Sequence, residues 1–466
     1  RLNLAWMDSC GSFQTFMGAM PFARHRMPSD EADMLRTMGL RSVDELFSDV
    51  PPAVRMKGLA LPPGLSEQDV VSRITEILAA NRTMADMPTF LGAGLYDHFV
   101  PASVRAITSR AEFYTSYTPY QPEVSQGILQ TLWEYQSLIC ELTGMDAANT
   151  SMYDASTALG EAARMTRRLH GGKIFLVPRA LRWHRRTVLG NYTWGGGLIV
   201  KEVEYDRETG MLDLADLRQH LTEDVCGLYV ENPNFFGRFE EQLQEIRSAT
   251  DAPLVVGINP IAQAVLRKPA DFGADIVIGE GQALGNAVNF GGPLLGIFAC
   301  RQEHVRKMPG RVIGLTKDAD GHRAFCMTLQ TREQHIRREK AMSNICTNES
   351  LMAVASAAYM AVLGSNGLRR VAVDCMRKAK DLAAAIRAIP GYEAPLFQGA
   401  HFNEFTLRYQ GGYEAVHATL LARGLHGGTQ HARHLRELRD FALFAVTERH
   451  TQRDLDRLLE ALRSVR

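Results

Sequence analysis

The chain has 466 residues, of which 45% are hydrophobic and 22% charged, and its formal net charge is zero. Without excess charge it lacks the general field that draws a protein to nucleic acid or to an anionic membrane. No apolar run approaches the roughly 18 residues that a membrane span needs. The seven cysteines include no C-x-x-C pair, which argues against a disulfide framework or a zinc site. We therefore expect a soluble, cytoplasmic protein of two or three domains, without a metal site.

The N-terminal region divides into two parts. Residues 1–26 show no helical period and no signal-peptide layout, so we expect a disordered tail or an upstream extension. Residues 27–89 contain a capped helix start at Ser29-Asp30-Glu31, a short amphipathic piece at Val43–Phe47 and a helix over Val70–Asn81. This pattern predicts a helical arm, and such arms more often embrace a neighbouring subunit or domain than form a core of their own.

The large middle region, residues 90–330, alternates strands with helices. Apolar runs predict strands at Lys173–Val177, Leu198–Tyr205, Cys226–Glu231, Pro253–Asn259, Asp275–Ile278 and Leu294–Cys300. Amphipathic runs predict helices at Ile128–Leu142, Leu214–Leu221, Phe239–Ala249 and Glu303–Met308. The alternation predicts an α/β domain with a parallel sheet and helices on both faces. No G-x-G-x-x-G follows the first strand and no P-loop motif occurs, so a nucleotide site is not supported.

Two smaller regions follow. Residues 331–390 begin with the basic segment Arg332–Lys340, for which the default interpretation is a helix with a solvated face. They continue as connecting helices over Glu349–Leu363 and Leu368–Ile389. Residues 391–466 predict a small α+β domain with strands and helices at Glu404–Arg408, Tyr413–Leu421, Phe441–Val446 and Gln452–Leu462.

Two stretches of the middle region have the composition of a contact site. Tyr117–Glu123 reads Tyr-Thr-Pro-Tyr-Gln-Pro-Glu, and its two prolines exclude a regular helix or central strand. The resulting fixed, extended loop suits either a packed corner or the wall of a pocket or interface. Ser156 and Thr157 stand at the start of a predicted helix, where a hydroxyl either caps the helix or binds phosphate. Capping is the more common role.

The stretch Gly273–Pro293 joins two predicted strands through a glycine-rich loop. In an open α/β sheet, ligands bind at the carboxyl ends of the strands. One large class of enzymes places a reactive lysine at this point, but this chain has Gln282, and no lysine occurs from residue 269 to 306. Glutamine has no amine and cannot form a Schiff base.

Five literal motifs resemble the P-protein (glycine decarboxylase) of the glycine cleavage system, and in particular subunit 1, the α chain of its two-chain form. They are Tyr117–Glu123, Met152-Tyr153-Asp154, Asn232–Gly237, Gly279–Gln282 and Thr331–Asn348. The resemblance runs from about Met20 to the C-terminus. It implies an aspartate-aminotransferase-like large domain (pyridoxal phosphate, PLP, fold type I), with a helical N-terminal arm and a small C-terminal α+β domain.

The resemblance also implies a division of labour between two homologous subunits. In that family, subunit 2, the β chain, carries PLP on a lysine, and the position of that lysine falls on Gln282. The aspartate that holds the pyridine nitrogen protonated falls on Val256. The implied reaction decarboxylates glycine and transfers the aminomethyl group to the lipoyl group of the H-protein. We therefore expect no catalytic residue on this chain alone, and an assembly with two copies of each subunit.

By resemblance, this chain completes the active site of its partner. The expected contributors are Tyr96, His98, Tyr117, Thr118, Pro119, Tyr120, Gln121 and Glu123. Ser156 and Thr157 occupy the former phosphate cup and are expected to survive as a helix cap. The basic residues Arg332, His335, Arg337, Arg338 and Lys340 are candidates for docking an acidic carrier, and the alternative is a solvated helix face.

Two alternatives stay open at this stage. The chain could be a self-sufficient PLP-dependent decarboxylase or aminotransferase that uses another lysine, with Lys340 as the best candidate. It could also be a non-catalytic scaffold that stabilises the β subunit or the H-protein. An absorbance band of lysine-bound PLP in the purified chain would support the first alternative.

Overall fold

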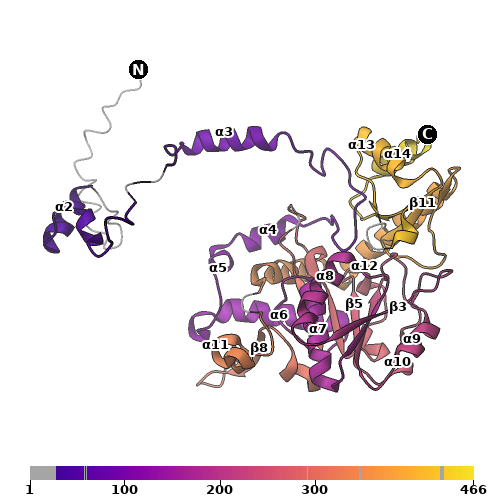
Figure 1. Cartoon of the computed structure of the whole chain (residues 1–466), viewed down its shortest axis with the longest axis horizontal. Coiled ribbons are helices and arrows are strands. Elements are labelled where there is room, and N and C mark those ends of the chain that lie inside the picture. The colour runs from indigo at the N-terminus through magenta and orange to yellow at the C-terminus, as the bar shows by residue number, and fades with distance from the viewer. Residues whose placement is uncertain are drawn as a thin grey trace. The chain divides into compact units, whose positions relative to one another are not determined.

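The computed structural model describes residues 28–56, 58, 60–290, 292–345, 348–430 and 435–465, and the expected tail, residues 1–26, lies outside them. The chain separates into two compact units, Arg1–Asn81 and Arg82–Arg466, which are shown in Figure 1.

The N-terminal unit consists of short helices joined by irregular chain. Helix α2 spans Pro28–Thr37, the 3-10 helix η2 spans Val43–Phe47, and α3 spans Glu67–Leu78. Ser66 caps α3, because its side chain accepts a hydrogen bond from the backbone N–H of Asp69. No residue of α3 is buried, and its apolar side chains Val70, Val71, Ile74, Ile77 and Leu78 are all exposed.

The second unit is built on a seven-stranded sheet with the order β1-β7-β6-β5-β4-β2-β3. The strands are β1 Ala147–Ala148, β2 Ile174–Pro178, β3 Ile199–Val203, β4 Val225–Asn232, β5 Leu254–Ile258, β6 Ile276–Glu280 and β7 Gly296–Cys300. Strands β2 to β6 are parallel, but β7 runs antiparallel to β6. The prediction of a parallel sheet was therefore wrong for β7. A parallel neighbour needs a crossover, usually through a helix, and the described part of the link from β6 to β7, residues 281–290 and 292–295, contains no helix beyond the 3-10 turn η6 (Gly281–Ala283).

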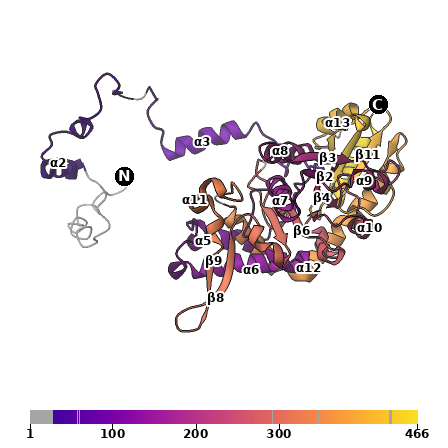
Figure 2. The ribbon, with the colours of Figure 1, turned by 60° about the horizontal axis from the view of Figure 1, so that its bottom comes forward.

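Helices cover both faces of this sheet (Figure 1, Figure 2). On one face, α7 (Ala155–His170) packs on side chains such as Phe175 and Val255. On the other face, α6 (Gln126–Thr143) and α12 (Ser350–Arg387) pack on Leu176 and Leu254. Helix α8 (Trp183–Trp194) packs against α7. Further helices of this unit are α4 Ala102–Thr108, α5 Ala111–Tyr114, α9 Leu214–His220 and α10 Leu243–Ala249. Helix α8 was not predicted, and the predicted helix at Glu303–Met308 is the 3-10 helix η7, Gln302–Lys307.

Helix α12 is two helices that meet at Gly364, whose φ of 60° and ψ of −177° are not helical. This agrees with the two separate helices expected there. By length and composition alone, α12 meets the requirement for a membrane-spanning helix, although we expected no such run. Instead of standing apart, it packs against α6 and α4, and its buried residues include Val354, Tyr359 and Leu382.

The C-terminal part carries a separate antiparallel sheet of four strands in the order β10-β11-β13-β12, with two helices. These elements are β10 Tyr392–Glu393, β11 Glu404–Tyr409, α13 Tyr413–Ala422, β12 Thr429–Gln430, β13 Phe441–Ala445 and α14 Gln452–Arg463. The elements expected in this region are all present. Their core contains Phe405, Leu420, Phe444 and Leu458.

One hairpin was not predicted from the sequence, and the prediction for the segment after it was wrong. Strands β8 (Val312–Lys317) and β9 (Arg323–Thr328) form an antiparallel hairpin. The basic segment Arg332–Lys340, expected to be a helix, is instead a series of short turns: η8 Gln330–Arg332, α11 Gln334–Arg337 and η9 Arg338–Lys340. The helix breaks because Arg338 has a φ of 52°, which lies outside the right-handed helical region.

Candidate functional site

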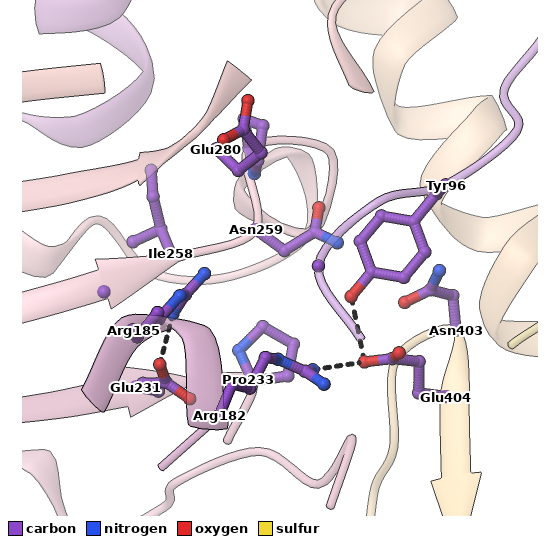
Figure 3. Close-up of a pocket in the computed structure, with 13 residues that line it drawn as sticks. Tyr96, Arg182, Arg185, Glu231, Pro233, Ile258, Asn259, Glu280, Asn403 and Glu404 are labelled. Carbon is purple, nitrogen blue, oxygen red and sulfur yellow. Dashed lines mark hydrogen bonds and ion pairs between the residues drawn. The ribbon is translucent and has the colours of Figure 1, made fainter. Parts of the chain in front are cut away.

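A small pocket with a cavity volume of about 30 Å³ lies where the carboxyl ends of β4, β5 and β6 meet the C-terminal part (Figure 3). Its charged lining residues are Arg182 and Arg185 at the start of α8, Glu231 on β4, Glu280 at the end of β6 and Glu404 on β11. The strand ends also contribute Gly257, Ile258 and Asn259, and the segment before α4 contributes Gly94 and Tyr96. This is the position where an open α/β sheet binds its ligand.

On one side of this pocket, three groups donate hydrogen bonds to Glu404. Its carboxylate accepts hydrogen bonds from the hydroxyl of Tyr96 (2.9 Å), from Arg182 Nη2 (2.9 Å) and from the backbone N–H of Ala93 (2.6 Å). A Cβ on Gly92 would lie 2.3 Å from Glu404 Oε1, so only glycine allows this segment to approach so closely. Burial raises the pKa of Tyr96 well above its usual range, which keeps the hydroxyl protonated as a donor.

A second buried group fills the other side. Arg185 pairs with Glu231 and also donates a hydrogen bond to the hydroxyl of Tyr229, at 3.0 Å. That hydroxyl in turn donates to Glu231 Oε1 at 2.8 Å. Both arginines of the pocket are thus neutralised by glutamates of the same chain (Figure 3).

Gln282 is buried, and its amide is fully used. Its Nε2 donates to the backbone carbonyls of Tyr96 (3.1 Å) and Asn286 (2.6 Å), while its Oε1 accepts from the backbone N–H of Tyr96 (3.1 Å). These bonds require both a donor and an acceptor at the end of one side chain, which a lysine does not provide. Gln282 therefore holds the Tyr96 segment against the end of β6.

Glu280 joins the end of β6 to α7 and to β7. Its carboxylate accepts hydrogen bonds from the backbone N–H groups of Gln282 (3.0 Å), Leu295 (2.9 Å) and Ala155 (3.1 Å). Burial raises the pKa of Glu280 to about 7, because these bonds only partly offset the loss of hydration.

The residues of this pocket do not fit a lysine-bound PLP. No lysine is among the residues that line it. Val256 is fully buried in the core with Leu254 and Leu228, so it supplies no charge for a pyridine nitrogen. At the N-terminus of α7, Thr157 is engaged in a capping box, with its N–H bonded to Asp154 at 2.8 Å and its hydroxyl accepting from the N–H of Asp154 at 3.1 Å. Ser156 beside it is buried.

The family model described as "Glycine cleavage system P-protein" matches residues 24–462. The chain belongs to the P-protein family. It is similar to a protein of Pyrococcus abyssi named "Probable glycine dehydrogenase (decarboxylating) subunit 1", with 47% identity over 452 residues that cover 95% of this chain and 100% of that protein. A protein of the same name from Carboxydothermus hydrogenoformans is 45% identical over 439 residues, which cover 93% and 98% of the two chains.

Solved structures agree with this assignment. The crystal structure of a glycine decarboxylase (P-protein) in inhibitor-bound form matches with a TM-score of 0.88 and 39% identity, and covers 96% of this chain and 100% of that chain. A sphingosine-1-phosphate lyase from Burkholderia pseudomallei matches with a TM-score of 0.63 and 15% identity, over 89% of this chain and 93% of that chain. The second match shows the fold alone. The large unit has the PLP fold type I architecture, as the P-protein motifs implied.

The residues expected to complete a partner's site fall into two separate groups. Tyr96 and His98 are 7% and 4% exposed, and both are bonded within this chain. Burial alone would raise the pKa of Glu448, but the hydrogen bond to His98 (2.7 Å) and other partners lower it to about 2. Cys375 lies close to the same carboxylate, at 3.4 Å. These three side chains could together hold a metal ion, but their ligand atoms already bond to one another.

The Tyr117–Glu123 loop does not line the pocket. As expected, it has no regular structure before the short 3-10 helix η3, Pro122–Val124. Tyr117 is 73% exposed and Tyr120 is 45% exposed, whereas Pro119 is buried and Thr118 is half-buried. Gln121 and Glu123 are exposed as well.

The basic residues proposed for carrier docking differ in their availability. Arg332 is half-buried and donates to the backbone carbonyls of Met308 and Gly310, so it holds the chain together locally. The ring of His335 stands edge-on to Tyr120, with 6.3 Å between centroids. Arg337, Arg338 and Lys340 are exposed. The structure thus brings the basic segment and the Tyr117–Glu123 loop together, which sequence spacing did not show.

A groove between α4, the loop residues 285–287, 289 and 293, and the start of α12 was also missed. Its lining includes apolar residues such as Val104 and Met352 and two strongly exposed aromatic residues: Phe99 is 60% exposed and Tyr114 is 70% exposed. Large exposed apolar patches on a folded chain mark surfaces that bind another molecule. Asn286 lies at one side of this groove, and its backbone carbonyl accepts a hydrogen bond from Gln282.

Proposed function

We propose that this chain is subunit 1 of a two-subunit glycine decarboxylase and completes an active site whose PLP is bound by the partner, subunit 2. The assembled enzyme decarboxylates glycine and passes the aminomethyl group to the lipoyl group of the H-protein. The names of the relatives from Pyrococcus abyssi and Carboxydothermus hydrogenoformans support the assignment. We further propose an assembly of two copies of each subunit, in the cytoplasm.

The observation that carries this proposal is the state of Gln282. At the position where the family resemblance implies the cofactor lysine, the chain has an amide whose donor and acceptor are both bonded to the backbone of Tyr96. The two arginines of the strand-end pocket, Arg182 and Arg185, are paired with Glu404 and Glu231. A pocket whose polar groups bond to one another supplies neither the covalent anchor nor the free charges that PLP requires.

The contribution to the partner comes from the exposed aromatic surface. We propose that the Tyr117–Glu123 loop closes over the partner's bound substrate and that the groove beside Phe99 and Tyr114 receives the partner chain. A rigid loop from a neighbour excludes water from the reacting centre and helps to orient the lipoyl arm. Their exposure supports this role.

The test is co-purification with a lysine-bearing homologous subunit. We expect this chain alone, mixed with PLP, to show no absorbance band of a lysine-bound cofactor and no exchange of the glycine carboxyl carbon with bicarbonate. We expect the co-purified pair to show both. A band from this chain alone that borohydride fixes to a lysine would contradict the proposal.

The same experiment decides between the alternatives. Lys340 is exposed and is not among the residues that line the strand-end pocket. A self-sufficient enzyme would be supported if peptide mapping located borohydride-fixed PLP on Lys340. A pure scaffold predicts that the assembled complex keeps full carboxyl exchange when Tyr117, Tyr120 and Glu123 are all replaced by alanine. A large loss of exchange in an intact complex excludes the scaffold.

A further inference from the structure

One buried arginine holds the Tyr117–Glu123 loop from behind. Arg311 is 7% exposed. Its Nη1 donates to Thr118 Oγ1 at 3.1 Å, and its Nη2 donates to the hydroxyl of Tyr120 at 3.0 Å. The guanidinium carbon also lies 5.4 Å from the centroid of the Tyr120 ring. A single planar group therefore fixes both the polar end and the ring of Tyr120, a geometry that lysine cannot reproduce.

The charge of Arg311 is directed at these hydroxyl groups. The carboxylate that pairs with it, Glu333, keeps its Oε2 3.7 Å from Arg311 Nε, which is too far for a hydrogen bond. The Nε atom is buried without a hydrogen-bond partner. Hydrogen bonds from a charged donor are roughly twice as strong as neutral ones. The bonds to Thr118 and Tyr120 are therefore the main hydrogen-bonding role of this side chain.

Arg311 stands at the root of a rigid hairpin. Its backbone carbonyl accepts from the N–H of Thr150 at 2.8 Å, directly before β8 begins. Gln136 of α6 then fixes β8, because its Nε2 donates to the carbonyl of Ile313 (3.0 Å) and its Oε1 accepts from the N–H of the same residue (2.8 Å). The arginine is thus tied to the large unit on both sides.

A second glutamine of α6 ties the other strand and the end of the loop. Gln126 donates to the carbonyl of Phe325 on β9 at 2.8 Å and accepts from its N–H at 2.9 Å. The same Nε2 donates to the carbonyl of Pro122 at 2.8 Å. In both views α5, α11 and the hairpin lie at the same end of this unit (Figure 1, Figure 2), so α6 forms one platform for the hairpin and the loop.

We propose that Arg311 is a positioning residue for the reaction, because it sets the place at which Tyr117 and Tyr120 meet the partner's active site. This inference rests on the proposed function of the Tyr117–Glu123 loop. It deepens that proposal by assigning the loop's geometry to a residue that does not touch the substrate. A displacement of about 1 Å in such a contact lowers a rate on the order of 100-fold.

The test uses the assembled two-subunit enzyme. With Arg311→Gln, we expect kcat for glycine carboxyl exchange to fall roughly 10- to 100-fold, while KM for glycine changes by less than about threefold and the complex still elutes as one species. Arg311→Lys keeps the charge without the fork and recovers only part of the rate. The matched control is Arg323→Gln, because Arg323 is an exposed arginine on the same hairpin, 5.7 Å from the ring of Phe325. We expect it to leave kcat unchanged.

A second set of variants covers the case in which Arg311→Gln does not assemble. Thr118→Val combined with Tyr120→Phe removes both acceptors and leaves Arg311 in place, and we expect the same loss of kcat. An unchanged kcat in that variant overturns the inference. Where Arg311→Gln assembles, adding Tyr120→Phe to it should slow the enzyme by less than about twofold more, and fully multiplicative losses also overturn it.

The outcomes distinguish a failure of the role of Arg311 from a failure of the proposed role of the Tyr117–Glu123 loop. A loss of activity with Tyr117→Ala but none with Arg311→Gln refutes the role of Arg311 and leaves the proposed function intact. Full activity with both variants refutes the role of the loop, and the role of Arg311 fails with it.

Discussion

The strand-end pocket and the Tyr117–Glu123 loop gather similar side chains but are built in opposite ways. In the pocket, Glu404 and Arg182 face each other at 2.9 Å in the interior. In the loop, Tyr117 and Tyr120 are exposed, while the buried Arg311 holds Thr118 and Tyr120 from the inside. The polar groups of the pocket bond to one another, whereas the loop presents exposed side chains that another molecule can contact. A buried cluster of charges at the usual ligand position is therefore no evidence of an active site until the partners of each charge are known.

Glu404 makes more hydrogen bonds to other pocket-lining residues than any other residue described above, so its removal should have the largest effect on the free energy of unfolding. Glu404→Ala leaves Arg182 buried without its carboxylate, and removes the acceptor of Tyr96 and Ala93. Breaking a buried ion pair in this way costs about 3–5 kcal/mol, which urea unfolding of the purified chain measures. The control is Glu393→Ala, since Glu393 pairs with Arg408 at the surface, and we expect a loss of less than about 1 kcal/mol. Equal losses would show that the pocket is not held by its own charges.

The pocket also carries a pH signature. The pKa of Glu280 is raised from 4.5 to about 7 by burial, so the folded chain binds more protons than the unfolded chain between these values. Stability from this group is therefore full below about pH 4.5 and falls as the pH rises toward 7. In Glu280→Gln, this dependence disappears.

We expect the stability of the original chain relative to Glu280→Gln to fall by about 3 kcal/mol between pH 4.5 and pH 8. Denaturant unfolding at several pH values measures the difference. The lost acceptor for Ala155 adds an offset that does not vary with pH. Glu240, whose pKa burial also raises to about 7, is present in both proteins and cancels. A difference that is constant with pH would mean that Glu280 is already ionised at low pH.

The loop should show the reverse pattern, with a loss of activity and little loss of stability. We expect Tyr117→Ala with Tyr120→Ala to lower carboxyl exchange in the assembled enzyme on the order of 100-fold. The unfolding free energy of the chain should fall by no more than about 1–3 kcal/mol, because Tyr117 is 73% exposed and the main loss is the hydroxyl of Tyr120 that accepts from the buried Arg311. Trp194→Ala, at an exposed aromatic residue on α8, serves as the control and should change neither quantity.

A further test uses Gln282, which follows the pocket-lining Glu280 by two residues and bonds to the backbone of the pocket-lining Tyr96. Gln282→Leu keeps the volume but leaves the backbone N–H and C=O of Tyr96 without the bonds they make to this amide. An unsatisfied buried group costs about 1–3 kcal/mol, and we expect a loss of that order in urea unfolding. Gln282→Lys with Val256→Asp should be destabilised as well and should give no absorbance band of lysine-bound PLP. Such a band would show that the pocket is still a cofactor site.

The sequence predicted those parts of the fold that depend on neighbouring residues. Strands β4, β5 and β6 are runs of buried apolar residues with turns after them, so their positions were found within a few residues. The hairpin β8–β9 was missed because only part of it is buried and the exposed half of β8, Leu315–Lys317, shows no apolar alternation. The basic segment was misread because a charge run does not reveal the positive φ of Arg338.

The only feature of the candidate site that the sequence predicted was the absence of a chemical group, the lysine amine. The absence of a lysine at Gln282 could be read directly from the sequence, but the bonds of its amide could not, since Tyr96 is 186 residues away. The same limit applies to Arg311, which lies 193 residues from Thr118. Pairings over such distances are decided by tertiary structure, and no periodicity or spacing in a single sequence encodes them.

The bonds of Glu404 also set an order of events during synthesis. Ala93 and Arg182 leave the ribosome long before Glu404, which follows Ala93 by 311 residues. Until β11 is made, the arginine has no carboxylate to accept it and the segment from Gly92 to Tyr96 has no anchor on that side. Contacts between distant parts of a chain form late and slow its folding. The hydrogen bonds of Ala93 and Arg182 to Glu404 can therefore form only after β11 has been synthesised, and the pocket of the nascent large unit stays incomplete until then.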